Sequence, residues 1–269
     1  MIPALPDCDP LPAMQAQQQV TPYDDGELYD SIFESHHDDL PYWLAFAREG
    51  GGPFLDLACG TGRVLVPLLE AGLDGDGLDA SEAMLARCRE KLDALDVSPA
   101  LVQAQMTSFR MPRKYQRVFC AFNAFAHLLD TQAQLAALRC VREHLAEGGA
   151  FGLDLGYARP EIWDAKPGER VLEGEFVHPA RPTRLYLYDR RTMDREAQTQ
   201  HSQIEIEERD LHGCLLETRV SHTVLRWTQE EELVQLFRAA GYSRWEIHAG
   251  FAREPLTTGA QQMIAVAWR

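Results

Sequence analysis

Short apolar segments alternate with amphipathic segments from residue 54 to residue 155, and this alternation limits the possible folds more than any other feature. The predicted strands are 54–57, 77–79, 100–103, 117–122 and 150–155, and the helices between them are 63–71, 81–92 and 131–145. Strands connected through helices pair in parallel. We therefore expect an α/β protein with a mostly parallel sheet and helices on both of its faces.

Residues that favour helix ends support these boundaries. Ser81 is a predicted N-cap. Thr131 and Thr228 each begin a capping box, in which Ser or Thr is followed three residues later by Gln or Glu. An earlier helix is predicted over 40–48, with Pro41 in its first turn and a run of glycines as its stop.

The pattern changes after residue 156. Polar and apolar residues alternate over 184–190, 200–208 and 215–226, with turn residues between these segments. Such alternation is typical of antiparallel strands. A helix after residue 228 and strands over 245–248 and 263–268 then return the chain to the main sheet.

Bulk composition excludes some classes of partner. The chain has 26 Lys and Arg against 41 Asp and Glu, a formal net charge of -15, which argues against nucleic acid as the main partner. No apolar run of about 18 residues predicts a membrane span, and the start lacks the basic and apolar segments of a signal peptide, so we expect a cytoplasmic protein. Residues 1–22 are rich in proline and glutamine and are predicted to be a flexible leader.

The segment His36-His37-Asp38-Asp39 superficially suggests a metal site. Adjacent side chains do not point at one centre, and no second cluster has ligand spacing. A solvated or helix-capping role is the better interpretation, and no metal is expected.

A glycine-containing turn follows the first predicted strand, in the sequence Asp56-Leu57-Ala58-Cys59-Gly60-Thr61-Gly62. Small residues there allow a ligand to approach the backbone, beside the N-terminus of the next helix. A dinucleotide fingerprint would need glycine at position 65, where Leu65 stands, so a nicotinamide oxidoreductase is disfavoured. A second acid, Asp79, ends the next strand, where a carboxylate can accept hydrogen bonds from a ribose diol.

These residues resemble the signature of the class I S-adenosylmethionine-dependent methyltransferases, acid-x-Gly-x-Gly-x-Gly. Asp56, Gly60 and Gly62 match it, and Ala58 stands where the family usually has its first glycine. The resemblance implies a Rossmann-like doubly wound sheet of seven strands, with an inserted antiparallel sheet. The element order is similar to the branch of glycine N-methyltransferases and aminosugar N,N-dimethyltransferases.

The resemblance also implies roles for individual residues. Asp56 and the backbone of 58–62 would face the methionine part of S-adenosylmethionine, and Asp79 would take the ribose hydroxyls. Ala80 and Met84 would flank the adenine, and Gln105, in Ala104-Gln105-Met106, would accept a hydrogen bond from its amino group. The cofactor-binding residues implied are Tyr29, Asp56, Ala58, Cys59, Gly60, Thr61, Gly62, Asp79, Ala80, Met84, Gln105, Met106, Phe122 and Asn123.

Two side chains are candidates for catalysis. His127 follows the fourth strand, where an acceptor would approach, and Tyr29 matches a tyrosine that the family folds over the methyl donor. Histidine is a common general base, although a core or loop-ordering histidine is the more frequent case. Tyr29 could instead be a packing residue at a helix start, which is the less favoured of the two interpretations.

The expected regions are a leader (1–22), a cofactor-binding core (23–155), an antiparallel insertion on the acceptor side (156–226) and the last helix and strands of the core (227–269). The expected reaction is methyl transfer to a small-molecule amine. An O-methyltransferase, an oxidoreductase and a binding module that has lost the reaction remain alternatives, and a homodimer stays open. Leu185 and Leu187 share one face of the inserted sheet and Tyr186 and Tyr188 the other. Either pair could roof the acceptor pocket, although plain packing within the sheet is the favoured interpretation.

Overall fold

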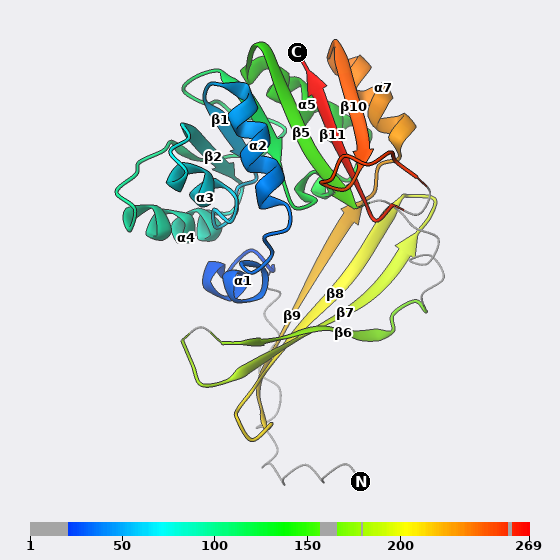
Figure 1. The fold of residues 1–269 in the computed structure, drawn as a ribbon. Helices are drawn as coiled ribbons and strands as arrows, with labels where there is room; N and C mark the ends of the chain where they lie inside the picture. Colours follow the sequence, from blue (N-terminus) through cyan, green and yellow to red (C-terminus); the bar gives the residue numbers. More distant parts are fainter. Residues whose placement is uncertain (1–20, 157–165, 179, 258–259) are drawn as a thin grey trace.

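Seven strands form the central sheet, in the spatial order β10-β11-β5-β4-β1-β2-β3 (Figure 1). This arrangement is seen in a computed structural model that describes residues 21–156, 166–178, 180–257 and 260–269. The strands are β1 (Phe54–Leu57), β2 (Gly75–Asp79), β3 (Leu101–Gln103), β4 (Tyr115–Cys120), β5 (Leu145–Gly156), β10 (Arg244–Ala249) and β11 (Gln262–Trp268).

The strands β1 to β5 are parallel to one another, whereas β11 pairs antiparallel with both β5 and β10. The order of the strands reverses at β1, which lies between β2 and β4. In open sheets of this type ligands bind beyond the carboxyl ends of the strands at such a switch point. The expected mostly parallel seven-stranded sheet is therefore confirmed.

Helices cover both faces of this sheet. They are α1 (Gly26–Phe33), α2 (Leu40–Gly50), α3 (Leu65–Glu70), α4 (Glu82–Asp93), the 3-10 helix η1 (Ala124–His127), α5 (Thr131–His144) and α7 (Glu230–Ala240). The helix α2 is terminated by its C-cap residue Gly51, which adopts the left-handed conformation that glycine tolerates. As predicted, Ser81 caps α4, and its hydroxyl accepts a hydrogen bond from the Met84 amide.

Two groups of buried side chains fill the space between helices and sheet. On one face, Trp43 and Phe46 of α2 pack with Phe119 of β4. On the other face, Leu138 of α5 and Phe237 of α7 pack against the sheet. These fully buried aromatic and aliphatic side chains supply the apolar burial that holds the strands, and hence their carboxyl ends, in place.

A second sheet of four antiparallel strands extends away from the core (Figure 1). Its strands are β6 (Arg170–Val177), β7 (Arg184–Asp194), β8 (Thr199–Arg209) and β9 (Leu215–Arg226). One of its faces carries a ladder of ion pairs in which Arg170 and Arg190 both contact Glu205. The helix α1 lies between this sheet and the core. The predicted antiparallel insertion is thus confirmed, and its first strand, β6, was not predicted.

Three local predictions are wrong. The side-chain cap of α5 is Asp130 rather than Thr131, because the Asp130 carboxylate reaches the Ala133 amide. The N-cap of α7 is Gln229, which makes no side-chain capping bond, because the Thr228 hydroxyl instead accepts from Gln134. The fourth strand was predicted to end at residue 122, but β4 ends at Cys120, because Phe122 and Asn123 have a positive φ that a strand does not allow. The predicted leader falls almost wholly on residues 1–20, outside the described residues.

Candidate functional site

The turn between β1 and α3 has an unusual backbone. Ala58, Gly60 and Gly62 all have positive φ, at 64°, 55° and 84°. A Cβ added at Gly60 would meet no atom within 4 Å, whereas one at Gly62 would lie 2.8 Å from both the Cys88 sulfur and a Val66 methyl. Gly60 therefore leaves an open surface for a ligand, and Gly62 lets α4 pack closely against the turn.

Asp79, at the carboxyl end of β2, fixes the shape of this turn. One carboxylate oxygen accepts from the Gly60 amide at 2.8 Å, and the other accepts from the Ser81 amide at 2.8 Å. Burial raises the pKa of Asp79, and the backbone N–H groups that donate to it oppose that rise. The second predicted acid thus lies directly against the glycine turn.

Asp56 lies beneath the same turn and is 2 % exposed. Burial raises its pKa to about 8, with the positive charge of Arg63 opposing the shift. A carboxyl group with this pKa is largely protonated at neutral pH and can donate a hydrogen bond as well as accept one. Cys59, the next buried side chain of the turn, points into the core, so only its backbone can face a ligand.

The turn is tied to α1 through Thr61, whose hydroxyl donates to Asp30 at 2.5 Å. Asp30 is buried and also pairs with Arg87 and Lys91 of α4, each at 2.8 Å. This buried carboxylate therefore joins the glycine turn, α1 and α4. These three partners compensate the cost of burying the Asp30 charge.

Phe122 and Asn123 follow β4 with φ values of 58° and 59°. Two consecutive left-handed residues that are not glycine are rare and mark a site where the backbone is held against its preference. The Asn123 side chain accepts from the Gly156 amide, and the Asn123 amide donates to Asp154. The Arg63 guanidinium lies 4.7 Å from the Phe122 ring centre.

His127 contacts a tyrosine that the sequence reasoning missed. The Tyr23 hydroxyl and the His127 Nε2 are 2.9 Å apart, and the two rings meet edge to face. Burial lowers the pKa of His127 from 6.5 and raises that of Tyr23 to about 12. Tyr29 does not reach His127 in this way, but its ring contacts Tyr23 and Phe33. Tyr23 carried no motif, and only its position before α1 could have drawn attention to it.

The structure brings most of the predicted residues together. Asp56 lies in β1 and the turn 58–62 follows it, Asp79 ends β2, and Asn123 follows β4. The carboxyl ends of these three neighbouring parallel strands meet at one edge of the sheet. Ala80 is exposed beside Asp79, whereas Met84 is only 1 % exposed. Gln105 is exposed in the turn after β3, and Met106 is half-buried against the core.

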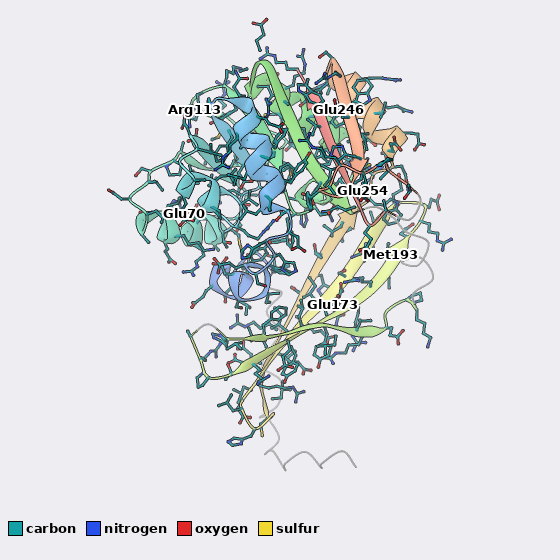
Figure 2. The ribbon with its side chains drawn as sticks, in the orientation of Figure 1. Glu70, Arg113, Glu173, Met193, Glu246 and Glu254 are labelled. Atoms are coloured by element: carbon teal, nitrogen blue, oxygen red, sulfur yellow. The ribbon has the colours of Figure 1, made fainter. Side chains whose placement is uncertain are left out.

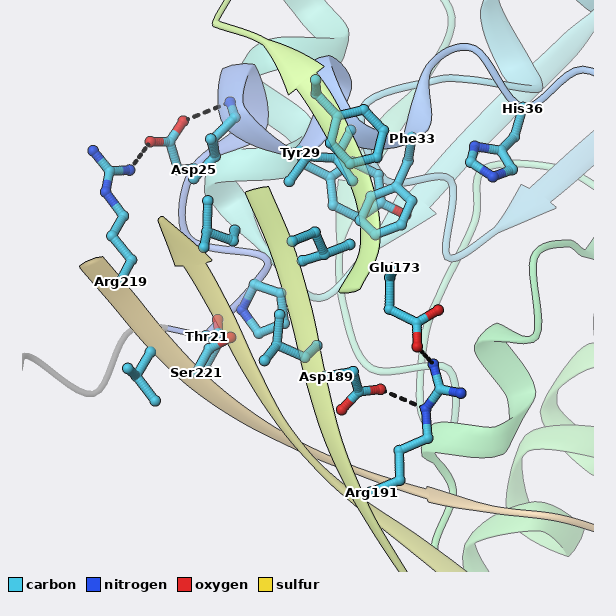
Figure 3. A pocket seen from close by; sticks show the side chains of 18 residues that line it. Thr21, Asp25, Tyr29, Phe33, His36, Glu173, Asp189, Arg191, Arg219 and Ser221 are labelled. Carbon is cyan, nitrogen blue, oxygen red and sulfur yellow. Dashed lines mark hydrogen bonds and ion pairs between the residues drawn. The ribbon is translucent and has the colours of Figure 1, made fainter. Parts of the chain in front are cut away.

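A cavity of about 280 Å³ lies between α1 and the four-stranded sheet (Figure 3). Its wall includes Tyr29 and Phe33 from α1 and Leu187 from β7. Tyr186 and Tyr188 lie on the opposite face of the sheet, each stacked under an arginine. Of the two pairs considered from the sequence, the leucine face is therefore the one turned towards the cavity.

Comparison with known proteins assigns the core. A domain family described as "Methyltransferase domain" matches residues 54–149. The dTDP-3-amino-3,4,6-trideoxy-alpha-D-glucopyranose N,N-dimethyltransferase of Streptomyces venezuelae is 37% identical over 95 residues, which cover 35% of this chain and only 38% of the relative. The cypemycin N-terminal methyltransferase of Streptomyces sp is 26% identical over 90% of this chain and 95% of its own length.

Solved structures of methyltransferases have the same fold as this chain. A crystal structure of an S-adenosylmethionine-dependent methyltransferase from Clostridium acetobutylicum superposes with a TM-score of 0.74 at 17% identity, over 90% of this chain and 96% of that one. Residues 54–149 of this chain therefore carry a methyltransferase domain, and the chain is similar to S-adenosylmethionine-dependent methyltransferases.

The residues present at this turn fit S-adenosylmethionine, the cofactor of the similar methyltransferases. Gly60 leaves room at the turn, and the Asp79 carboxylate lies at the end of β2 beside it. In the described part of the chain, no group of three His, Cys, Asp or Glu side chains is placed to hold a metal ion. Asp39, from the segment examined for metal binding, forms a bidentate ion pair with Arg63 at 2.6 Å.

None of the helices that the structure describes in this chain is long and apolar enough to cross a membrane.

The left-handed backbone of Ala58 generates a stability prediction. Because a Cβ costs about 1–2 kcal/mol in this conformation, and glycine loses more entropy on folding, Ala58→Gly is expected to stabilise the protein by about 1 kcal/mol. Thermal unfolding measures this change. Ala94→Gly, at an exposed site with φ -68°, is the matched control and is expected to destabilise. A lower melting temperature for Ala58→Gly would contradict the strain argument.

Proposed function

We propose that this methyltransferase transfers a methyl group to an amine nitrogen of a small molecule. The observation that carries the proposal is the Asp79 carboxylate bonded to the Gly60 amide beside an open glycine surface. Both curated relatives described above are N-methyltransferases by name, one for an amino sugar and one for a peptide N-terminus. Their names support nitrogen as the acceptor atom.

The proposed cofactor contacts follow from the geometry at the carboxyl edge of the sheet. The turn 58–62 and Asp56 would face the methionine part, and Asp79 would accept from the ribose hydroxyls. Ala80, exposed beside Asp79, would lie against the adenine together with the turn at Gln105 and Met106. Met84 would contribute only the small part of its surface that is not buried.

S-adenosylmethionine supplies an electrophilic methyl group on a positively charged sulfur. Transfer is an in-line displacement, so the chain has to align the nucleophile and exclude water. Phe122 and Asn123, held by Asp154 and Gly156, would form one wall of the methyl-transfer site. Tyr29 would form another, from α1.

His127 would hold or remove the acceptor proton. Its lowered pKa keeps the imidazole neutral at pH 7, and a neutral ring nitrogen can accept a proton. The hydrogen bond with Tyr23 fixes the position of the ring. A hydroxyl acceptor would depend strongly on this base, whereas an amine can lose its proton to water.

The charge of the chain and an exposed edge strand bear on its partners. The net charge of -15 supports a small molecule rather than nucleic acid as acceptor, and we propose the cytoplasm as the compartment. The edge strand β6 exposes Val171, Leu172 and Val177, which supports a homodimer. Light scattering of the purified chain would give its mass in solution, and a monomeric mass would remove the dimer from the proposal.

The role of Asp79 is tested by cofactor binding. Asp79→Asn is expected to weaken S-adenosylmethionine binding roughly tenfold or more, because a charge-assisted hydrogen bond to the ribose contributes about 1.5–3 kcal/mol. Calorimetric titration measures the dissociation constant, and circular dichroism checks the fold. Asp93→Asn, an exposed carboxylate on α4, is the control and should bind normally. Equal affinities for the two variants would exclude Asp79 from the ribose site.

The role of His127 is tested by turnover. For a phenol or alcohol, His127→Gln is expected to lower kcat roughly a hundredfold, the usual contribution of a general base, and for an amine much less. Because only the neutral imidazole accepts a proton, wild-type kcat/KM should fall as the pH drops through a pKa below 6.5, and the variant should lose this limb. His222→Gln, on exposed β9 surface, is the control. If His127→Gln kept the wild-type pH profile, His127 would be a packing residue and not the base.

A further inference from the structure

The cavity between α1 and the four-stranded sheet has largely apolar walls (Figure 3). Those walls are formed by Leu28, Ile32 and Phe33 of α1 and by Leu187, Ile204 and Ile206 of the sheet. Apolar surface around a cavity of this kind favours a ligand with an apolar body, positioned by a small number of polar groups.

One polar group in the wall is incompletely satisfied. Asp189 is 7 % exposed. Its Oδ2 accepts from the Arg191 guanidinium at 2.6 Å and from the Ser202 hydroxyl at 3.1 Å, whereas its Oδ1 has no hydrogen-bond partner among the residues that the structure describes. A buried carboxylate oxygen without a donor is unfavourable, and a ligand that brings a donor removes that cost.

The charges around the cavity select the kind of donor. Three carboxylates (Asp25, Glu173 and Asp189) and two guanidinium groups (Arg191 and Arg219) line it. Each guanidinium is already paired, Arg219 with Asp25 at 2.9 Å and Arg191 with both Glu173 at 2.9 Å and Asp189 at 2.6 Å, so that three carboxylates share two positive charges. Neither is spare for a diphosphate, and the surplus carboxylate favours a cation.

The cavity also borders the methyl-transfer site proposed above. Tyr29 lines the cavity and contacts Tyr23, which in turn contacts His127. In Figure 3, Tyr29 lies on the α1 side of the cavity and Asp189 on the side of the strands, where β7 carries it. A ligand that fills the cavity can therefore present one end to the Tyr29 side and the other to Asp189.

We propose that this cavity is the acceptor subsite, and that it takes an acceptor with an apolar body and an ammonium group that donates to Asp189 Oδ1. This ammonium is separate from the nitrogen that is methylated, because a nitrogen must be unprotonated to attack. An acceptor carrying a nucleoside diphosphate does not fit the charges of this cavity. The inference rests on the proposed function and specifies its substrate class.

Binding to the full chain loaded with S-adenosylhomocysteine tests the subsite, with phenethylamine, phenylpropanoate and thymidine diphosphate as probes in calorimetric titrations. Phenethylamine is expected to bind more tightly than either anion. Asp189→Asn should weaken phenethylamine roughly tenfold, since it removes a charge-assisted hydrogen bond, and should leave S-adenosylhomocysteine binding unchanged. Glu175→Gln, an exposed carboxylate of β6 on the other face, is the control and should bind like wild type.

Leu187→Trp provides a second variant, which fills the cavity without touching the ion pairs and should abolish phenethylamine binding. Tighter binding of either anion than of phenethylamine, or unchanged phenethylamine affinity in Asp189→Asn or Leu187→Trp, would overturn the inference. Failure of the proposed function has a different signature, because S-adenosylhomocysteine would then fail to bind the wild-type chain itself.

Discussion

The hydrogen bond from the Gly60 amide to Asp79 is the interaction on which the rest of the site depends. It joins the turn after β1 to the end of β2, so that two neighbouring strands present one continuous backbone surface. The sheet supplies the rigidity, because β1 is fully buried between β2 and β4. The left-handed turn is stable only because these buried strands hold its two ends.

Asp30 extends this organisation outwards. By bonding to Thr61 and pairing with Arg87 and Lys91, it fixes α1 against the core. The same helix presents Tyr29 to the cavity beneath it. One short helix therefore links the proposed donor site to the four-stranded sheet, and Figure 2 shows how densely side chains fill the core above it.

The sequence predicted the sheet and the glycine turn because both depend on local patterns: apolar runs, glycine positions and acids at strand ends. The cap at Asp130 and the absence of a capping bond at α7 were missed, because these depend on which neighbour a hydroxyl finds in three dimensions, as Thr228 finds Gln134. Tyr23 was missed for the same reason, since 104 residues separate it from His127. The position of Asp189 depends on how Arg191 of its own strand and Ser202 of the neighbouring strand pair with it, which no local pattern encodes.

The long strands of the inserted sheet also shape how this enzyme can diversify. Side chains alternate between the two faces of the sheet. Leu187 and Asp189 of β7 and Ile204 of β8 border the cavity, whereas Arg190 and Glu205 on the other face belong to the arginine and glutamate ladder. If the cavity takes the acceptor as proposed, mutations at these cavity positions would change acceptor choice while the residues between them preserve the ladder. Directed evolution of a new acceptor range would then vary those positions alone, away from the turn proposed to hold the methyl donor.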